Sequence, residues 1–137
     1  MTEPAFLTST RTSYDTLAAA YAERADDELA RKPLDRAVLG VFAELVREAG
    51  GGPIADVGCG TGMATAHLHS LGVDVRGIDL SPGMLAQARR RLPAVRFDVG
   101  SMFDLDLPDS GVAGLCAYYS TIHIPDELLP TVFAEFH

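Results

Sequence analysis

A glycine-rich turn over residues 56–62 is the part of the sequence best suited to chemistry. It reads Asp-Val-Gly-Cys-Gly-Thr-Gly and follows the short apolar stretch 53–55. Glycines at alternate positions let the backbone turn sharply and approach a bound molecule where a Cβ would collide. The pattern predicts a strand, a ligand-binding turn that contains Gly58, Gly60 and Gly62, and the start of a helix.

A carboxylate further along the chain is placed to bind the hydroxyl groups of a ribose. Asp79 lies in the segment Gly77-Ile78-Asp79-Leu80, at the end of an apolar run that predicts a second buried strand. In dinucleotide-binding folds, an acidic residue about 20 positions after the glycine-rich turn binds the ribose hydroxyls. The turn and Asp79 together predict a nucleoside-containing cofactor.

Details of the turn separate two kinds of cofactor. A dinucleotide fingerprint reads G-x-G-x-x-G/A and holds a pyrophosphate at the helix N-terminus. Here the third glycine comes one residue early, and Met63 stands where that fingerprint has Gly or Ala. Asp56 would repel a pyrophosphate but suits a cationic ligand. A nucleotide-dependent oxidoreductase is therefore the weaker interpretation.

These motifs resemble the signature of class I S-adenosylmethionine-dependent methyltransferases, whose cofactor carries a sulfonium and an ammonium group but no phosphate. The resemblance extends over residues 10–137. It implies that Asp79 binds the ribose, that Met84 covers the adenine, and that Ser101 or the Met102 backbone contacts the adenine edge, where the family usually has Asp. The cofactor-binding residues indicated in this way are Tyr14, Tyr21, Asp56, Gly58, Cys59, Gly60, Gly62, Asp79, Leu80, Met84, Ser101, Met102 and Ser120.

Three side chains have a structural interpretation beside a functional one. Tyr14 and Tyr21 lie on one face of a helix expected over 13–23. In the resembled family such a helix covers the cofactor as a lid, but aromatic residues at this spacing also form ordinary core. His123 follows the expected fourth strand, and histidine exchanges protons near neutral pH. It is the candidate catalytic base, or else a loop residue that shapes the pocket.

The elements that must position these residues alternate between strand and helix. Apolar runs predict strands near 54–58, 73–78, 94–99 and 112–119, and helical periodicity predicts helices near 62–70, 82–92 and 126–136. Ser81 before Pro82 is a favourable helix start, because the hydroxyl caps the helix and proline fits its first turn. The alternation predicts an α/β, three-layer Rossmann-like fold with a parallel sheet. The resemblance implies the N-terminal half of the methyltransferase sheet, in the strand order 3-2-1-4.

We expect two regions in the chain. Residues 1–52 would form the N-terminal helices: a polar lead-in over 1–11, the lid helix, a charged connector over 24–31 and a sheet-packing helix. The apolar stripe of that last helix is Leu34, Ala37, Val38, Val41, Phe42, Leu45 and Val46. Residues 53–137 would form a cofactor-binding core that is incomplete at its C-terminus, because four of the family's seven strands fit. The chain is then either a fragment of a methyltransferase or a compact variant that a partner chain completes. The exposed edge of the fourth strand predicts a homodimer.

Composition excludes some classes of function. A net charge of −8 argues against a nucleic-acid-binding surface. No apolar run approaches the ~18 residues that span a bilayer, and no secretory signal is expected. The two cysteines favour reduced thiols in the cytoplasm. We expect S-adenosylmethionine-dependent methyl transfer to a small molecule, by in-line displacement at the sulfonium methyl and without a metal. A cofactor-binding module without turnover is the alternative.

Overall fold

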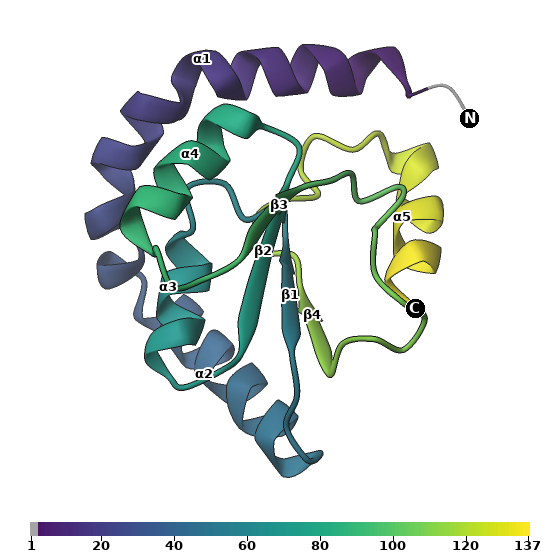
Figure 1. Cartoon of the computed structure of the whole chain (residues 1–137). Helices are drawn as coiled ribbons and strands as arrows, with labels where there is room; N and C mark the ends of the chain where they lie inside the picture. Colours follow the sequence, from purple (N-terminus) through teal and green to yellow (C-terminus); the bar gives the residue numbers. More distant parts are fainter. Residues whose placement is uncertain (1–2) are drawn as a thin grey trace.

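The computed structural model describes residues 3–137, apart from the side chains of residues 25 and 26. Its centre is a four-stranded sheet in the order β3-β2-β1-β4, in which every pairing is parallel (Figure 1). The strands are β1 (Ile54–Val57), β2 (Val75–Asp79), β3 (Phe97–Val99) and β4 (Gly114–Cys116). The expected α/β fold class and strand order are confirmed.

Helices cover both faces of the sheet, so that the fold has three layers (Figure 1). On one side lie α2 (Pro33–Glu48), α3 (Met63–Ser70) and α4 (Pro82–Arg91), and on the other lies α5 (Leu129–Phe136). Successive strand residues point to opposite faces. Ile54 and Val75 therefore pack in the cluster beneath α2 and α3, whereas Ala55, Val57 and Ile78 pack in the cluster on the α5 side.

The carboxyl ends of the parallel strands meet at one edge of the sheet. β1 ends just before Gly58, β2 ends at Asp79, β3 ends before Gly100 and β4 ends shortly before Tyr118. Ligands of open α/β sheets bind at this edge, outside the strand ends. Helix α1 (Ala5–Glu28) runs across it in Figure 1.

Helix α1 is longer than the sequence patterns predict. The expected lead-in and charged connector are wrong for the residues within Ala5–Glu28, which form one continuous helix; residues 1–2 lie outside the described part. The chain has no Gly or Pro inside this stretch to interrupt it. Arg31 pairs with Asp27 at 3.2 Å and Lys32 with Glu28 at 2.8 Å, and such i,i+4 pairs stabilise helical turns.

Helix α2 buries one side of its broad apolar stripe. Phe42 and Val46 approach β4 so closely that a Cβ at Gly114 would lie 2.9 Å from Phe42 and 3.0 Å from Val46. The opposite side of the stripe, Leu34, Val38, Val41 and Leu45, is 55–74 % exposed. The expectation that the whole stripe packs on the sheet is therefore wrong for these four side chains, because the sheet reaches one side of the helix.

The last strand and the last helix are shorter than expected. β4 covers Gly114–Cys116 rather than 112–119, and Tyr119 has a left-handed φ of 51°, which is incompatible with a strand that reaches residue 119. A 3-10 turn, η2 (Asp126–Leu128), precedes α5. None of the described helices is both long and apolar enough to cross a membrane.

Candidate functional site

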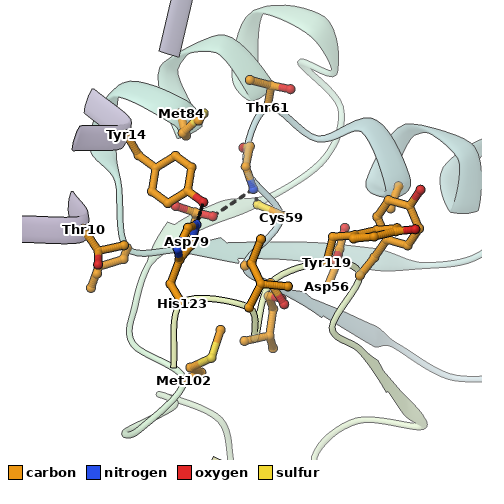
Figure 2. A pocket seen from close by; sticks show the side chains of 18 of the residues that line it. Thr10, Tyr14, Asp56, Cys59, Thr61, Asp79, Met84, Met102, Tyr119 and His123 are labelled. Atoms are coloured by element: carbon orange, nitrogen blue, oxygen red, sulfur yellow. Dashed lines mark hydrogen bonds between the residues drawn. The ribbon is translucent and has the colours of Figure 1, made fainter. Parts of the chain in front are cut away.

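A pocket of about 380 Å³ lies at the carboxyl edge of the sheet, under α1 (Figure 2). Its wall combines the turn after β1, the ends of β2 and β3, the loop after β4 and one face of α1. The structure brings together in this wall thirteen residues that the sequence indicates: Tyr14, Tyr21, Asp56, Gly58, Cys59, Gly60, Asp79, Leu80, Met84, Ser101, Met102, Ser120 and His123.

The three glycines of the turn have different roles. All have positive φ, at 73° for Gly58, 55° for Gly60 and 83° for Gly62. Gly58 lies against the loop after β4, since a Cβ there would be 2.2 Å from the Cβ of Ser120, while a Cβ on Gly60 would meet nothing within 4 Å. Gly62 is absent from the described pocket wall; it begins α3, and its Cβ would meet Ala88 at 3.3 Å. It allows close packing against α4, and its contact with a ligand stays a prediction.

Asp79 is held rigidly at the end of β2. Its Oδ2 accepts a hydrogen bond from the Gly60 N–H at 2.8 Å (Figure 2). Its Oδ1 accepts one from the Ser81 N–H at 2.9 Å. Burial raises the pKa of Asp79, although these backbone hydrogen bonds oppose the shift. Each carboxylate oxygen keeps lone-pair capacity for a further donor. Asp79 can therefore accept hydrogen bonds from the two hydroxyls of a ribose.

Asp56 is a buried carboxylate with an unused oxygen. It is 1 % exposed; its Oδ2 accepts a hydrogen bond from the Thr65 hydroxyl at 2.6 Å, and its Oδ1 has no partner among the described residues. Burial raises the pKa of Asp56 to about 6, with Thr65 opposing the shift and the charge of Asp79 adding to it. Ionisation of Asp56 costs more free energy in the folded chain than in the unfolded chain. The contribution of Asp56 to folding stability is therefore most favourable at a pH below its unfolded pKa of 3.8 and least favourable at a pH above about 6. A cationic ligand group would offset that cost.

Tyr14 joins α1 to the loop after β4 across the pocket. Its hydroxyl is hydrogen-bonded to Nε2 of His123, and the two rings meet edge to face with centroids 5.3 Å apart (Figure 2). The Tyr21 ring lies 5.9 Å from the Tyr14 ring. Burial raises the pKa of Tyr14, and the neighbouring Tyr21 and Asp79 add to the shift. Tyr14 is therefore a neutral hydroxyl that closes one side of the pocket.

Apolar and thiol side chains complete the part of the wall near β2 and β3. Met84 is 3 % exposed in the first turn of α4, and Ser101 accepts a hydrogen bond from the Phe103 N–H at 3.2 Å. Cys59 packs in the core cluster with Leu85 and Phe97, and burial raises its thiol pKa well above the usual value. Cys59 is therefore a packed, protonated thiol and contributes to the wall without being a nucleophile.

Sequence reasoning missed several residues of the wall. They include Phe6, Leu7, Glu28, Lys32, Tyr118 and Tyr119. Phe6, Thr10 and Tyr14 are spaced four residues apart, as on one face of a helix. This spacing in the sequence could have placed Phe6 in the wall. Lys32 and Tyr119 are distant in sequence, yet the Lys32 ammonium lies 4.7 Å from the centre of the Tyr119 ring. No local pattern predicts such a contact.

The fold and the pocket define an α/β domain of the Rossmann-like class, with its ligand pocket at the carboxyl edge of a parallel sheet. A family model described as a methyltransferase domain matches residues 54–137. This chain belongs to that family.

Individual relatives agree with the family. The chain is 41 % identical over 71 residues to the dTDP-3-amino-3,6-dideoxy-alpha-D-glucopyranose N,N-dimethyltransferase of Streptomyces fradiae, a match that covers 52 % of this chain and 28 % of that protein. CalS10, an amino pentose methyltransferase from Micromonospora echinaspora solved with bound SAM, is 28 % identical, with a TM-score of 0.61 over 74 % of this chain and 44 % of that one.

A further solved structure supports the fold over the whole chain. Magnesium protoporphyrin IX methyltransferase from Synechocystis PCC 6803 has a TM-score of 0.74 and 16 % identity, and the match covers 99 % of this chain and 72 % of that one. The chain spans about a fifth to two fifths of the length of the curated relatives that it matches.

Proposed function

We propose that the chain binds S-adenosyl-L-methionine and transfers its methyl group to a small-molecule acceptor by in-line displacement at the sulfonium methyl. The observation that carries this proposal is the pair of carboxylates in one pocket, Asp56, which is buried, and Asp79, which is partly buried. A cofactor with two cationic groups and a free ribose suits both of them, whereas a pyrophosphate would be repelled. The methyl group is already activated, so the protein has mainly to align the acceptor and exclude water.

The wall suggests where each part of the cofactor binds. Asp79 takes the ribose, and the adenine lies between Met84 and the segment that carries Met102. The methionine part follows Gly58 and Gly60, with its ammonium directed towards the unused oxygen of Asp56. This arrangement assigns residues 53–137 to the cofactor-binding core. It assigns residues 1–52 to a lid, α1, and a sheet-packing helix, α2.

His123 and Tyr14 are the proposed groups at the acceptor side. His123 lies in the loop after β4 and borders the pocket, so its imidazole is the candidate base for an acceptor that must lose a proton. Tyr14 is the proposed lid residue, supported by its contact with His123. Two of the relatives are named for amino sugars, which makes amino sugars the first acceptors to screen.

Calorimetry tests cofactor binding directly. We expect the chain to bind S-adenosylhomocysteine and not NAD. Asp79→Ala should weaken that binding about tenfold or more, because hydrogen bonds to a charged acceptor contribute roughly 1.5–3 kcal/mol. The matched control is Asp74→Ala, which removes an exposed carboxylate next to the other end of β2 and should leave affinity unchanged. Preferential binding of NAD, or equal affinity of the Asp79→Ala variant and the unaltered chain, would contradict the proposal.

We further propose that two copies associate through the β4 edge. β4 pairs with β1 on one side, and on its other side no strand of the described chain pairs with it, so its backbone is open to pairing. Helix α2 packs on β4 through Phe42 and Val46, and the other side of its apolar stripe is exposed. Sedimentation velocity should show a fraction of dimer that increases with protein concentration. This fraction should decrease in the Leu45→Glu variant, because Leu45 is an apolar side chain that is 59 % exposed. A monomer at every concentration would contradict this proposal.

The net charge of −8 supports the absence of a nucleic-acid partner. The free thiols of Cys59 and Cys116 support the cytoplasm as the compartment, because thiols stay reduced there. Fractionation of the source cells tests the compartment, and recovery of the protein outside the cytoplasmic fraction would contradict it.

A further inference from the structure

Helix α1 docks over the pocket with few fully buried apolar side chains and with several polar contacts. Among its described side chains, Leu7 and Ala18 are buried, while Leu17 and Tyr21 are each 47 % exposed. A surface helix normally docks through a continuous apolar stripe. Two buried side chains in a helix of 24 residues do not make such a stripe. Phe6 adds an edge-to-face contact with Phe103 near the start of the helix, and polar contacts further along fix α1 in the position that brings Tyr14 into the pocket.

Asp15 provides a specific contact with the connector between β2 and α4. Its Oδ1 accepts hydrogen bonds from the Ser81 hydroxyl at 2.5 Å and from the Gly83 N–H at 2.8 Å. One turn earlier, the Arg11 Nε donates to the Leu80 carbonyl at 3.2 Å. Asp15 also places a negative charge at the N-terminus of α4, where the helix dipole favours it. The hydrogen bond from Ser81, and then that from Gly83, lower the pKa of Asp15.

Gly83 allows α1 to lie against α4 at this point. A Cβ on Gly83 would be 2.9 Å from Asp15 Oδ1, 3.1 Å from its Cα and 3.3 Å from its carbonyl oxygen. Two of these three atoms belong to the backbone of α1 and cannot turn away. Gly83 lies in the first turn of α4, where alanine is otherwise the better helix former. The glycine at this position therefore fits the docking of α1 rather than the needs of α4.

The contact continues into the pocket. Ser81 is fully buried, caps α4 through the Met84 N–H at 3.1 Å, and donates its own N–H to Asp79 at 2.9 Å. Asp79 in turn accepts the Gly60 N–H at 2.8 Å. A single run of hydrogen bonds thus links Asp15 on α1 to Asp79 and to the glycine turn.

We propose that Asp15 is a positioning residue, which docks α1 onto the β2–α4 connector and thereby sets both the Tyr14 wall and the Asp79 carboxylate for the cofactor. The proposal rests on the proposed function, because it assumes that the pocket holds the cofactor. If only the docked form binds well, the apparent affinity falls by the same factor as the docked fraction. Asp15 itself does not line the pocket.

Substitution of Asp15 tests the docking and the binding separately. Asp15→Ala should weaken S-adenosylhomocysteine binding about tenfold, the size expected for the loss of charge-assisted hydrogen bonds, and should speed hydrogen exchange along α1 in the ligand-free chain. Asp15→Asn keeps one acceptor oxygen and should lie between the two. The control is Glu23→Ala, which removes an exposed carboxylate of the same helix and should change neither readout.

Gly83→Ala gives a test that does not depend on charge. The added Cβ should displace α1, so exchange along α1 should speed up and affinity should fall about tenfold, although α4 gains a better helix former. In the double variant Asp15→Ala/Gly83→Ala the two losses should be less than additive, because both act on one contact. Strict additivity, or a Gly83→Ala chain with unchanged exchange and affinity, would overturn the proposal.

The two readouts distinguish a failure of this proposal from a failure of the proposed function. If the unaltered chain does not bind S-adenosylhomocysteine, the proposed function fails, while hydrogen exchange in the ligand-free variants still tests the docking. If the unaltered chain binds the cofactor but Asp15→Ala changes neither affinity nor exchange along α1, the positioning role of Asp15 is wrong. In that case the proposed function stands.

Discussion

Replacing Gly58 by alanine is expected to lower the free energy of unfolding by about 2–5 kcal/mol and to abolish measurable binding of S-adenosylhomocysteine. Gly58 has a φ of 73°, and a Cβ there would lie 2.2 Å from the Cβ of Ser120 and 2.9 Å from its Oγ. A non-glycine residue in the left-handed region costs about 1–2 kcal/mol, and overpacking of a filled site costs about 1–3 kcal/mol more. Urea unfolding and calorimetry measure the two effects.

Gly72 offers a matched control for this experiment. Its φ is 80°, a Cβ there would meet nothing within 4 Å, and it does not line the pocket. Gly72→Ala should therefore show the backbone cost alone, about 1–2 kcal/mol, with unchanged affinity for the ligand. Equal destabilisation of the two variants would contradict the tight contact between Gly58 and Ser120. That contact is what joins the glycine turn to the loop after β4, because Ser120 also donates to the Val57 carbonyl at 2.8 Å.

The second large effect is expected at His123. In assays of methyl transfer from labelled S-adenosylmethionine to a panel of amino sugars and other small amines and alcohols, His123→Ala should lower turnover roughly 10²–10⁴-fold. Affinity for S-adenosylhomocysteine should stay nearly intact, because the side chain acts on the acceptor. The control is His69→Ala, which removes an exposed histidine of α3 that lies outside this pocket.

Each other outcome at His123 has a definite meaning. Unaltered turnover in His123→Ala would show that alignment of the acceptor suffices. Loss of cofactor affinity would show that His123, through its contact with Tyr14, shapes the pocket instead. Binding of the cofactor by the unaltered chain without transfer to any acceptor tested would favour the alternative of a cofactor-binding module.

Most of the candidate site could be predicted from the sequence because its residues belong to short, local patterns. The turn over 56–62 carries its glycines within seven positions, and Asp79 ends an apolar run that could form only a buried strand. Parallel strands bring their carboxyl ends to one edge, so residues that end different strands meet whatever the details of packing. The strand order and the shared pocket of Asp56 and Asp79 follow from these patterns and the family resemblance.

Other features required the tertiary structure. Local periodicity described α2 as one broad stripe, but only the position of the sheet determines that Leu39 is buried and Leu34 is 74 % exposed. The same holds for Gly62, whose place in the glycine pattern suggested ligand binding and whose neighbours are Ala88 and Phe97. Which side of an element is covered depends on residues far away in the chain.

The sequence by itself determined the class of fold and the kind of pocket, because glycine turns, strand ends and helix starts depend on neighbouring residues, while the strand order came from the family resemblance. The tertiary structure alone decided how α1 covers that pocket. Asp15 meets Gly83, and Tyr14 meets His123, across long stretches of chain. Such contacts arise from the relative placement of whole elements, which no pattern within one element encodes.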